Sequence, residues 1–271
     1  MYTIDGRADL PEHSLDHLGG YRRSSPVRVG NAASNHVQLD VYGEVLDAAY
    51  ICYHHMRKQM NDRAWKMFSQ LADGAAAHWG EDDRSIWEMR GKPQPYFYSK
   101  LLCWVALDRA IRLANEFHLP ANIDRWRTEA AKLRQAILER GYNEEVGAFT
   151  QAFGSKSLDA SSMAVPRVGF LPADDPRVIS TMERIREQLS ANGLVYRYLV
   201  GDDLPGSEGA FTSCTFWLID NLARLGRAEQ ARELFERVVH FSTTSACSPS
   251  RSTPRARSCS ATIPKASHTW R

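Results

Sequence analysis

The 271-residue sequence lacks the signatures of several protein classes. It contains no CxxC pair and no HExxH motif, so we expect no metal site and no cofactor. No apolar run approaches the length of about 20 residues that a membrane-spanning helix needs. The first ten residues have no basic start and no apolar core. The sequence therefore predicts neither a membrane partner nor a signal peptide.

Cysteine is scarce, and its spacing excludes a disulfide-rich scaffold. The chain has 5 cysteines, an odd number, and they are widely separated. Cys52, Cys103 and Cys214 lie within apolar helical patterns, which is typical of reduced thiols in a protein core. Because reduced thiols are typical of intracellular proteins, we expect a cytoplasmic location.

Neither sign of charge dominates the chain. Lys and Arg number 34, Asp and Glu number 32, and the net charge is +2. This balance argues against a nucleic-acid partner. Hydrophobic residues make up 43% and charged residues 24%, as in soluble globular proteins.

Apolar residues recur at three- and four-residue spacing along most of the chain, which predicts an all-α fold. Asn61 or Asp62 is a suitable N-cap for one of these helices. No convincing alternating strand is present. The predicted helices span about 37–56, 61–79, 97–117, 123–140, 159–169, 175–191, 209–225 and 227–241.

The predicted helices form pairs. Connections inside a pair are short and polar, whereas those between pairs are longer and richer in aromatic, glycine and acidic residues. This asymmetry favours an α/α toroid with one working face built from the longer loops. An irregular helical bundle is the alternative that periodicity leaves open.

The composition changes after residue 241. Residues 242–271 are crowded with Ser, Thr, Pro and Arg and contain no Asp or Glu. Such a segment buries too little apolar surface to offset its ordering entropy, so we expect a disordered tail behind a helical domain at 1–241. Its few cations are too dispersed to favour nucleic-acid binding.

Glu88 is the best candidate for acid–base chemistry. It follows Trp87 in "SIWEMRG", and an apolar neighbour raises the pKa of a carboxyl group. A raised pKa keeps a general acid protonated near neutrality. Arg90 either opposes this shift or binds a substrate hydroxyl. A loop salt bridge between Glu88 and Arg90 is the alternative, and spacing alone favours it.

Two further clusters have the chemistry of a sugar site, because sugars present apolar ring faces and many hydroxyls. One opens a helix in "GNAASNHVQLD". The other fills the loop "VYRYLVGDDLPGSEGAF". As alternatives, Glu208 is explained by a favourable interaction with a helix dipole, and Asp202 and Asp203 are explained as solvated side chains. The members of both clusters are Asn31, Asn35, Gln38, Asp40, Tyr196, Arg197, Tyr198, Asp202, Asp203 and Glu208.

With these clusters in order, the chain resembles glycoside hydrolase family 15, which contains glucoamylases and bacterial trehalases. The resemblance is carried by "MYTIDGRADLPEHSLDHLGGYRRSSPVRVGNAASNHVQLDVYGEVLDA", "SIWEMRGKPQPYFYSKLLCWVALDRAIRLA", "YNEEVGAFTQAFGSKSLDAS" and "LPGSEGAFTSCTFWLIDNLARLGRAEQARELFERV". It implies an (α/α)6 barrel and inverting hydrolysis of terminal α-glucosidic bonds, in α,α-trehalose or at α-1,4-glucan ends.

The resemblance also implies roles for individual residues. Glu88 corresponds to the general acid, which outweighs the salt-bridge alternative. The partner is a small carbohydrate. We expect it to contact Gln38, Asp40, Trp87, Arg90, Arg197, Asp202, Asp203 and Glu208.

The sequence departs from the family pattern at both ends. By comparison with the family, we expect the N-terminal β-sandwich and the first barrel helices to be absent and about eight of twelve barrel helices to remain. The family's general base would follow the last predicted helix, where this chain has no carboxylate. Inversion needs two carboxyl groups about 6.5–9.5 Å apart. We therefore expect impaired hydrolysis.

A frameshift near residues 241–243 would explain the tail. In the neighbouring reading frame, codons for "SATIPKASHTW" can encode "LGNYPQGFSHM", a family-like closing motif. The codon overlapping Ser250 would then encode the lost glutamate. The alternatives to an impaired hydrolase are a non-catalytic sugar-binding remnant and an unstable pseudogene product. An incomplete barrel would also permit association with a separate N-terminal fragment, or self-association.

Overall fold

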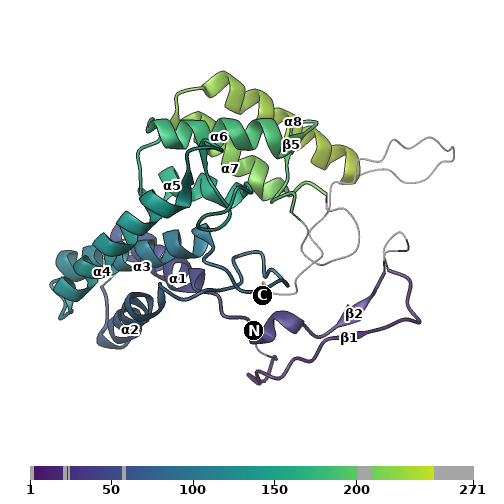
Figure 1. Cartoon of the computed structure of the whole chain (residues 1–271). Coiled ribbons are helices and arrows are strands. Elements are labelled where there is room, and N and C mark those ends of the chain that lie inside the picture. Colours follow the sequence, from purple (N-terminus) through teal and green to yellow (C-terminus); the bar gives the residue numbers. More distant parts are fainter. Residues whose placement is uncertain (1–2, 21–22, 24, 57–58, 201–208, 247–271) are drawn as a thin grey trace, which may run out of the picture.

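A computed structural model describes residues 3–20, 23, 25–56, 59–200 and 209–246, with the backbone alone for 241–246 (Figure 1). This part of the chain is built from eight α-helices, as an all-α fold requires. They are α1 (Asp40–Tyr50), α2 (Asp62–His78), α3 (Phe97–Glu116), α4 (Ile123–Ala136), α5 (Ala164–Arg167), α6 (Pro176–Gln188), α7 (Thr212–Arg224) and α8 (Ala228–Ala246).

Short turns and ribbons complete the described fold. Four helical turns are η2 (Ala32–Asn35), η3 (Ile51–His55), η4 (Ile137–Gly141) and η5 (Ala160–Met163). Three antiparallel ribbons, with two residues in each strand, pair β1 (His13–Ser14) with β2 (Arg28–Val29), β3 (Tyr142–Asn143) with β4 (Ala148–Phe149), and β5 (Ser190–Ala191) with β6 (Leu194–Val195).

Side-chain caps set the starts of two helices. The Asn61 side chain accepts a hydrogen bond from the Ala64 N–H at 2.9 Å, which confirms one of the two predicted N-caps. Asp175 accepts from the Arg177 N–H at 2.9 Å, and Pro176 begins α6. These caps satisfy N–H groups that have no partner within the helix.

The predicted helix at 159–169 is shorter in the structure and begins as the 3-10 turn η5. Gly169 adopts a φ of 74°, which ends α5, and the Phe170 N–H donates back to the Val165 carbonyl. Helix α8 continues to Ala246, beyond the predicted end at residue 241. Terminal residues are the part of a helix that periodicity locates least well.

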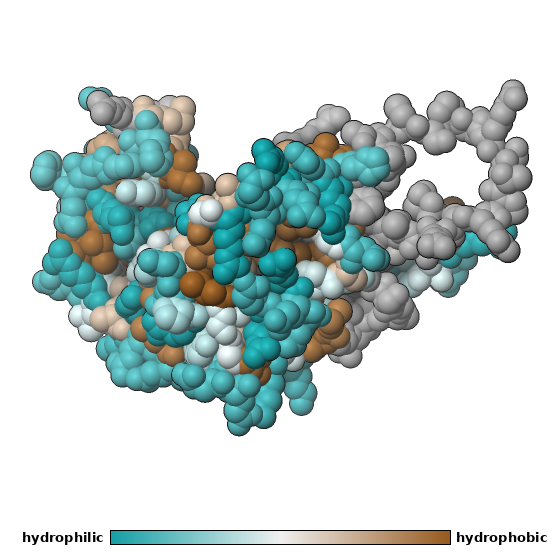
Figure 2. Space-filling model, turned by 90° about the horizontal axis from the view of Figure 1, so that it is seen from above, coloured by the Kyte–Doolittle hydropathy of each residue, from teal (hydrophilic) through white to brown (hydrophobic). Residues whose placement is uncertain are grey.

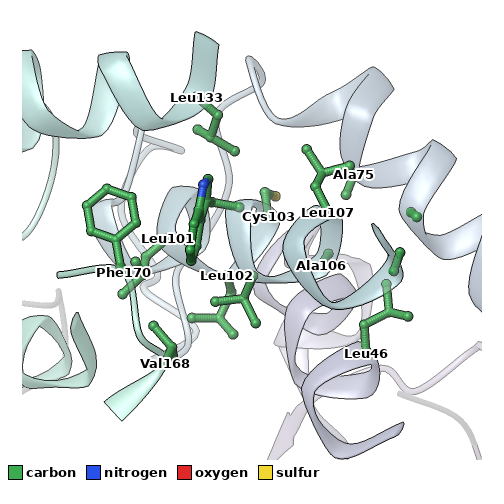
Figure 3. Packing of buried hydrophobic residues seen from close by; sticks show 14 of the residues in the cluster. Leu46, Ala75, Leu101, Leu102, Cys103, Ala106, Leu107, Leu133, Val168 and Phe170 are labelled. Atoms are coloured by element: carbon green, nitrogen blue, oxygen red, sulfur yellow. The ribbon is translucent and has the colours of Figure 1, made fainter. Parts of the chain in front are cut away.

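The core surrounds α3, which packs against α1, α2 and α4. Leu101, Leu102 and Leu107 of α3 are buried with side chains from each neighbouring helix (Figure 3). Residues 97–107 of α3 are buried around the whole helix, as in the interior of a protein. Gly43 lets α1 approach closely, because a Cβ atom there would lie 2.2 Å from the Leu102 carbonyl oxygen.

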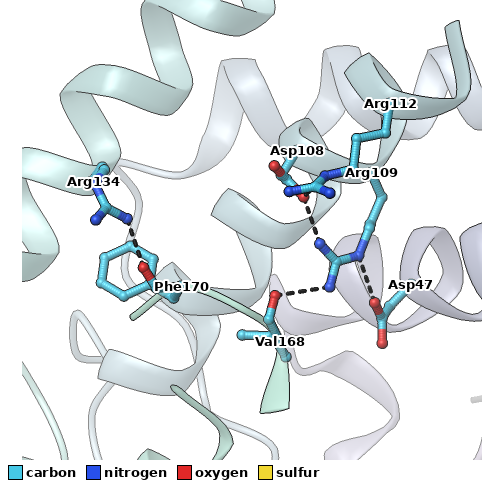
Figure 4. Close-up of polar contacts among 7 residues, drawn as sticks. All are labelled: Asp47, Asp108, Arg109, Arg112, Arg134, Val168 and Phe170. Atoms are coloured by element: carbon cyan, nitrogen blue, oxygen red, sulfur yellow. Dashed lines mark hydrogen bonds and ion pairs between the residues drawn. The ribbon is translucent and has the colours of Figure 1, made fainter. Parts of the chain in front are cut away.

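Buried polar contacts join the α1–α3 layer to the segment after α5 (Figure 4). The Arg109 guanidinium donates to Asp47 of α1 at 2.7 Å and to the Val168 carbonyl at 2.8 Å. Arg134 of α4 donates to the Phe170 carbonyl at 2.8 Å. The several charge-assisted bonds of Arg109 offset the cost of burying its guanidinium group.

The helices alternate between short and long connections, as predicted. Residues 117–122 join α3 to α4 and 225–227 join α7 to α8, whereas 79–96 and 189–211 connect successive pairs. Polar residues cover most of the face shown in Figure 2, with apolar residues interspersed. Among the helices of the described residues, none has both the length and the apolar character needed to cross a bilayer.

Candidate active site

Glu88 lies in the long connection between α2 and α3, on a tight turn of residues 85–88. Ser85 and Glu88 both have left-handed backbones, with φ of 62° and 55°. The Glu88 N–H donates to the Ser85 carbonyl at 3.1 Å. Each left-handed residue other than glycine costs on the order of 1 kcal/mol or more, so its surroundings must hold it there.

Polar side chains fix the backbone of this turn. The Arg84 guanidinium donates to the carbonyls of Met89 at 3.3 Å and Arg90 at 3.0 Å. Gln38 donates from Nε2 to the Ser85 carbonyl at 3.4 Å. The Gln38 cluster and the Glu88 loop, which the sequence places far apart, therefore meet.

The Glu88 carboxyl group is half-buried, and burial raises its pKa although the positive charge of Arg90 opposes the shift. Among the described residues, no side chain forms a hydrogen bond or ion pair with this carboxyl group. A half-buried carboxyl group with a raised pKa has the properties of a general acid. The direction of the shift agrees with the sequence-based expectation.

The salt bridge between Glu88 and Arg90 is not formed. Instead, Arg90 donates from Nη1 and Nη2 to the two carboxylate oxygens of Glu12, at 3.0 and 2.8 Å. These hydrogen bonds lower the pKa of Glu12 to about 2, and Arg28 adds to the effect from 3.3 Å. Arg90 thus ties the segment carrying β1 and β2 to the Glu88 loop.

Trp87 is packed in an aromatic box. Its ring centroid lies 6.4 Å from that of Tyr198, 5.8 Å from Phe211 and 6.0 Å from Trp217. The Arg197 guanidinium lies 5.2 Å from the Trp87 ring centroid. These contacts bring the predicted Arg197 cluster to the Glu88 loop. They also surround the Trp87 ring, which sequence analysis assigned to sugar binding, with protein groups.

Asp159, which sequence analysis missed, receives the indole N–H of Trp87. The two carboxylate oxygens lie 3.0 and 2.9 Å from Trp87 Nε1. Asp159 also accepts from the Ser161 N–H at 2.8 Å and so caps η5. The sequence Asp-Ala-Ser-Ser signals such a cap, but it gives no sign of the contact with Trp87.

Asp40 is buried at the start of α1. Burial, together with the charges of Asp83 and Glu44, raises the pKa of Asp40 to about 7. Its Oδ1 atom has no hydrogen-bond partner among the described residues. Asp83 accepts from the Leu39 N–H at 3.1 Å, which links the segment before α1 to the loop that carries Glu88.

Three predicted contact residues, Asp202, Asp203 and Glu208, lie outside the described residues. In the described part of the chain, no three His, Cys, Asp or Glu side chains gather in a metal-binding arrangement. The site therefore consists of the Glu88 turn, its supports Gln38 and Asp159, and the box around Trp87.

The paired helices and their alternating connections define an α/α fold, in which Glu88 lies in one of the longer connections. One solved glycosidase, in complex with glucose, aligns with a TM-score of 0.66 and 20% identity over 79% of this chain and 55% of its own. A wild-type glycosidase aligns with a TM-score of 0.64 and 20% identity over 75% of this chain and 52% of its own. These neighbours have the (α/α)6 fold, of which this chain forms a part.

The family model "Glycosyl hydrolases family 15" matches residues 1–271, and the chain belongs to this family. A trehalase of Mycobacterium tuberculosis is 42% identical over 246 residues, 90% of this chain and 36% of that protein. A trehalase of Thermoplasma volcanium is 37% identical over 243 residues, 88% of this chain and 38% of that protein. The chain thus spans well under half the length of these relatives.

Proposed function

We propose that the chain carries the acid half of an inverting glycoside hydrolase site for a terminal α-glucosidic bond, with α,α-trehalose as the leading substrate. Glu88 protonates the leaving oxygen. The observation that carries this role concerns the Glu88 carboxyl group, which is half-buried. Burial raises its pKa, and no side chain of the described residues forms a hydrogen bond or ion pair with it. The names of the relatives support trehalose over glucan ends.

We further propose that hydrolysis by this exact chain is impaired. An inverting reaction needs a second carboxylate to activate water. From Arg237 to the last residue the chain has no Asp or Glu, so the segment expected to carry that base supplies none. Loss of a general base lowers the rate typically by 10²–10⁴-fold. Gln38, Asp40, Arg197 and the acidic residues at 202–208 remain the proposed sugar contacts.

The experiment measures glucose release from trehalose and from maltooligosaccharides by the chain and by Glu88→Gln. Azide is added as a small nucleophile that needs no deprotonation. We expect azide to raise cleavage of trehalose in the chain but not in Glu88→Gln, because departure of the leaving sugar still needs the Glu88 proton. Glu236→Gln, which changes an exposed glutamate of α8, is the matched control.

Each outcome decides between the alternatives. Full turnover without azide that Glu88→Gln abolishes would refute the impairment and keep the acid. Equal and measurable rates in the chain and Glu88→Gln would refute the role of Glu88. Calorimetric binding of trehalose without any cleavage, with or without azide, would support the non-catalytic sugar-binding remnant instead.

We propose that exposed apolar edges of α1, α7 and α8 associate with another polypeptide, either a separate N-terminal fragment or a second copy. Val41 and Ile51 are exposed on and just after α1. Phe216 of α7 and Phe235 of α8 are exposed and in edge-to-face contact, with centroids 6.1 Å apart. Apolar side chains at such edges favour contact with another chain. Light scattering tests this, and a monomer at all concentrations would contradict self-association.

We also propose that the protein is located in the cytoplasm. Its support is that Cys52, Cys103 and Cys214 are free thiols and that two of them are buried. A fluorescent fusion expressed in the source cells tests the location directly, and export of the fusion would contradict it.

A further inference from the structure

Asp159 is a buried carboxylate that the proposed reaction does not use. It is 2% exposed, and it belongs to the connection before η5 rather than to the Glu88 loop. Burial raises the pKa of Asp159, whereas hydrogen bonds from Ser161, Trp87 and Gln151 oppose the shift. A carboxylate in the interior is costly unless such donors surround it. Its location therefore needs an explanation beyond the folding of one short turn.

Capping alone needs less than Asp159 provides. At the start of α6, Asp175 caps with one oxygen, which accepts from the Arg177 N–H at 2.9 Å, and its further hydrogen bonds come from the side chain of the same Arg177. Asp159 makes the equivalent bond to Ser161 with Oδ1, yet both of its oxygens also lie within 3.0 Å of Trp87 Nε1. The indole of Trp87 is thus held by a fork-like acceptor.

Of residues 85–88, Trp87 is the one that packs against the buried apolar cluster of α6 and α7, which includes Met182, Ile185, Leu218 and Leu222. Trp87 packs there against Phe211 and Trp217, both partly buried. Glu88 follows Trp87 directly and has a left-handed backbone, so the place of its carboxyl group depends on the contacts that hold the turn, and the anchored indole is one of them. Strained residues persist only where their neighbours over-determine the geometry.

We propose that Asp159 is a positioning residue, whose carboxylate anchors the Trp87 indole and thereby holds the Glu88 carboxyl group in its half-buried place. The inference rests on the proposed function of Glu88 as general acid. It adds a second carboxylate that acts through another residue and does not touch the substrate.

The test compares Asp159→Asn, Trp87→Phe and the double variant. Asparagine keeps one acceptor oxygen, so it can retain the Ser161 cap but not the two-oxygen contact. Phenylalanine removes the indole N–H and leaves the Asp159 cap untouched. We expect both single variants to lower kcat for trehalose, measured with azide, by roughly 10- to 100-fold with little change in KM, because a shift of about 1 Å at the reacting group has this effect. The double variant should be no worse than the worse single variant.

A readout independent of activity is the titration of the Glu88 carboxyl carbon by NMR, with the signal assigned through Glu88→Gln. In both single variants we expect the Glu88 pKa to fall towards the ordinary value of glutamate, since a loosened loop admits water. Arg90, the charged side chain that also acts on Glu88, is unchanged in every variant. The matched control is Asp175→Asn, which changes the capping aspartate of α6, whose hydrogen bonds go to Arg177 and not to Trp87, and it should leave both kcat and the Glu88 titration unchanged.

An unchanged Glu88 titration in folded Asp159→Asn, or effects of the two substitutions that simply add, would overturn the positioning role. If Asp159→Asn does not fold, an unchanged Glu88 titration in Trp87→Phe overturns it equally. If the chain cleaves no trehalose even with azide, the proposed function fails, yet the titration still decides whether Asp159 controls the Glu88 carboxyl group.

Discussion

Asp40→Asn should stabilise the folded chain above neutral pH. The pKa of Asp40 is raised from 3.8 to about 7, with burial as the largest cause and the charges of Asp83 and Glu44 adding to it. Between these two pKa values the folded state binds one proton more than the unfolded state. Stability therefore falls as pH rises, by up to 1.4 kcal/mol per pH unit. Over about 3 units the loss reaches about 4 kcal/mol.

Asparagine has nearly the shape of protonated aspartic acid and cannot ionise. Asp40→Asn should thus match the unsubstituted chain near pH 4 and exceed it by up to about 4 kcal/mol at pH 8. Urea unfolding followed by circular dichroism at pH 4, 5, 6, 7 and 8 gives both free energies, and the urea dependence should be equal for the two proteins. Asp83 and Asp159 remain in both proteins, so the difference between the curves reports on Asp40.

Asp62→Asn is the matched control, because both aspartates lie in the first turn of a helix. Asp62 of α2 is exposed, whereas Asp40 of α1 is buried. The control variant should lose only the favourable interaction with the helix dipole, about 0.3–1 kcal/mol, without a gain at high pH. Parallel pH curves for Asp40→Asn and the unsubstituted chain would refute the assignment of a neutral Asp40. A variant less stable than the unsubstituted chain at pH 8 would refute it as well.

Two further predictions concern the supports of the site. Gly43→Ala should destabilise the chain by about 1–3 kcal/mol, seen as a lower melting temperature, because the new Cβ atom meets the Leu102 carbonyl; Gly80→Ala, which faces open space, should change stability by less than about 0.5 kcal/mol. Glu12→Gln should cost about 1 kcal/mol near pH 6. Because the folded pKa of Glu12 is lowered to about 2, this cost should vanish as pH falls from about 4.5 towards 2; a cost that persists at pH 2 in urea titrations would contradict the ion pair with Arg90.

The sequence predicts the helices well because burial of one helical face requires a repeat that local spacing reveals. It fails at residues 159–169, where η5 and a short α5 replace a single helix. There the left-handed Gly169 and the buried cap of Asp159 decide the backbone, and apolar spacing does not record either of them.

In the candidate site, too, local features could be predicted from the sequence, whereas contacts between distant residues could not. The raised pKa of Glu88 could be predicted from its neighbour Trp87, since the effect of an apolar wall on a carboxyl group is local, but its proposed role as the acid depends on the family resemblance. The partners of the neighbouring residues are not evident, because Arg90 meets Glu12 and Trp87 meets Asp159 across 78 and 72 residues of chain. Sequence spacing favours a salt bridge between Glu88 and Arg90. It cannot reveal that Glu12, which is distant in the sequence, accepts the hydrogen bonds of the Arg90 guanidinium instead.

The sequence positions of the residues that hold the Glu88 turn decide whether Glu88 depends on the C-terminal segment. Glu12, Gln38, Arg84 and Asp159 hold the Glu88 turn, and all four lie before the segment where the family's base is expected. None of their hydrogen bonds requires that segment. We therefore infer that the proton donor and the base are separable parts of the site, so that loss of one leaves the geometry of the other intact. On this reasoning azide should raise cleavage without any change in the Glu88 titration, because it replaces only the nucleophile that a general base would activate.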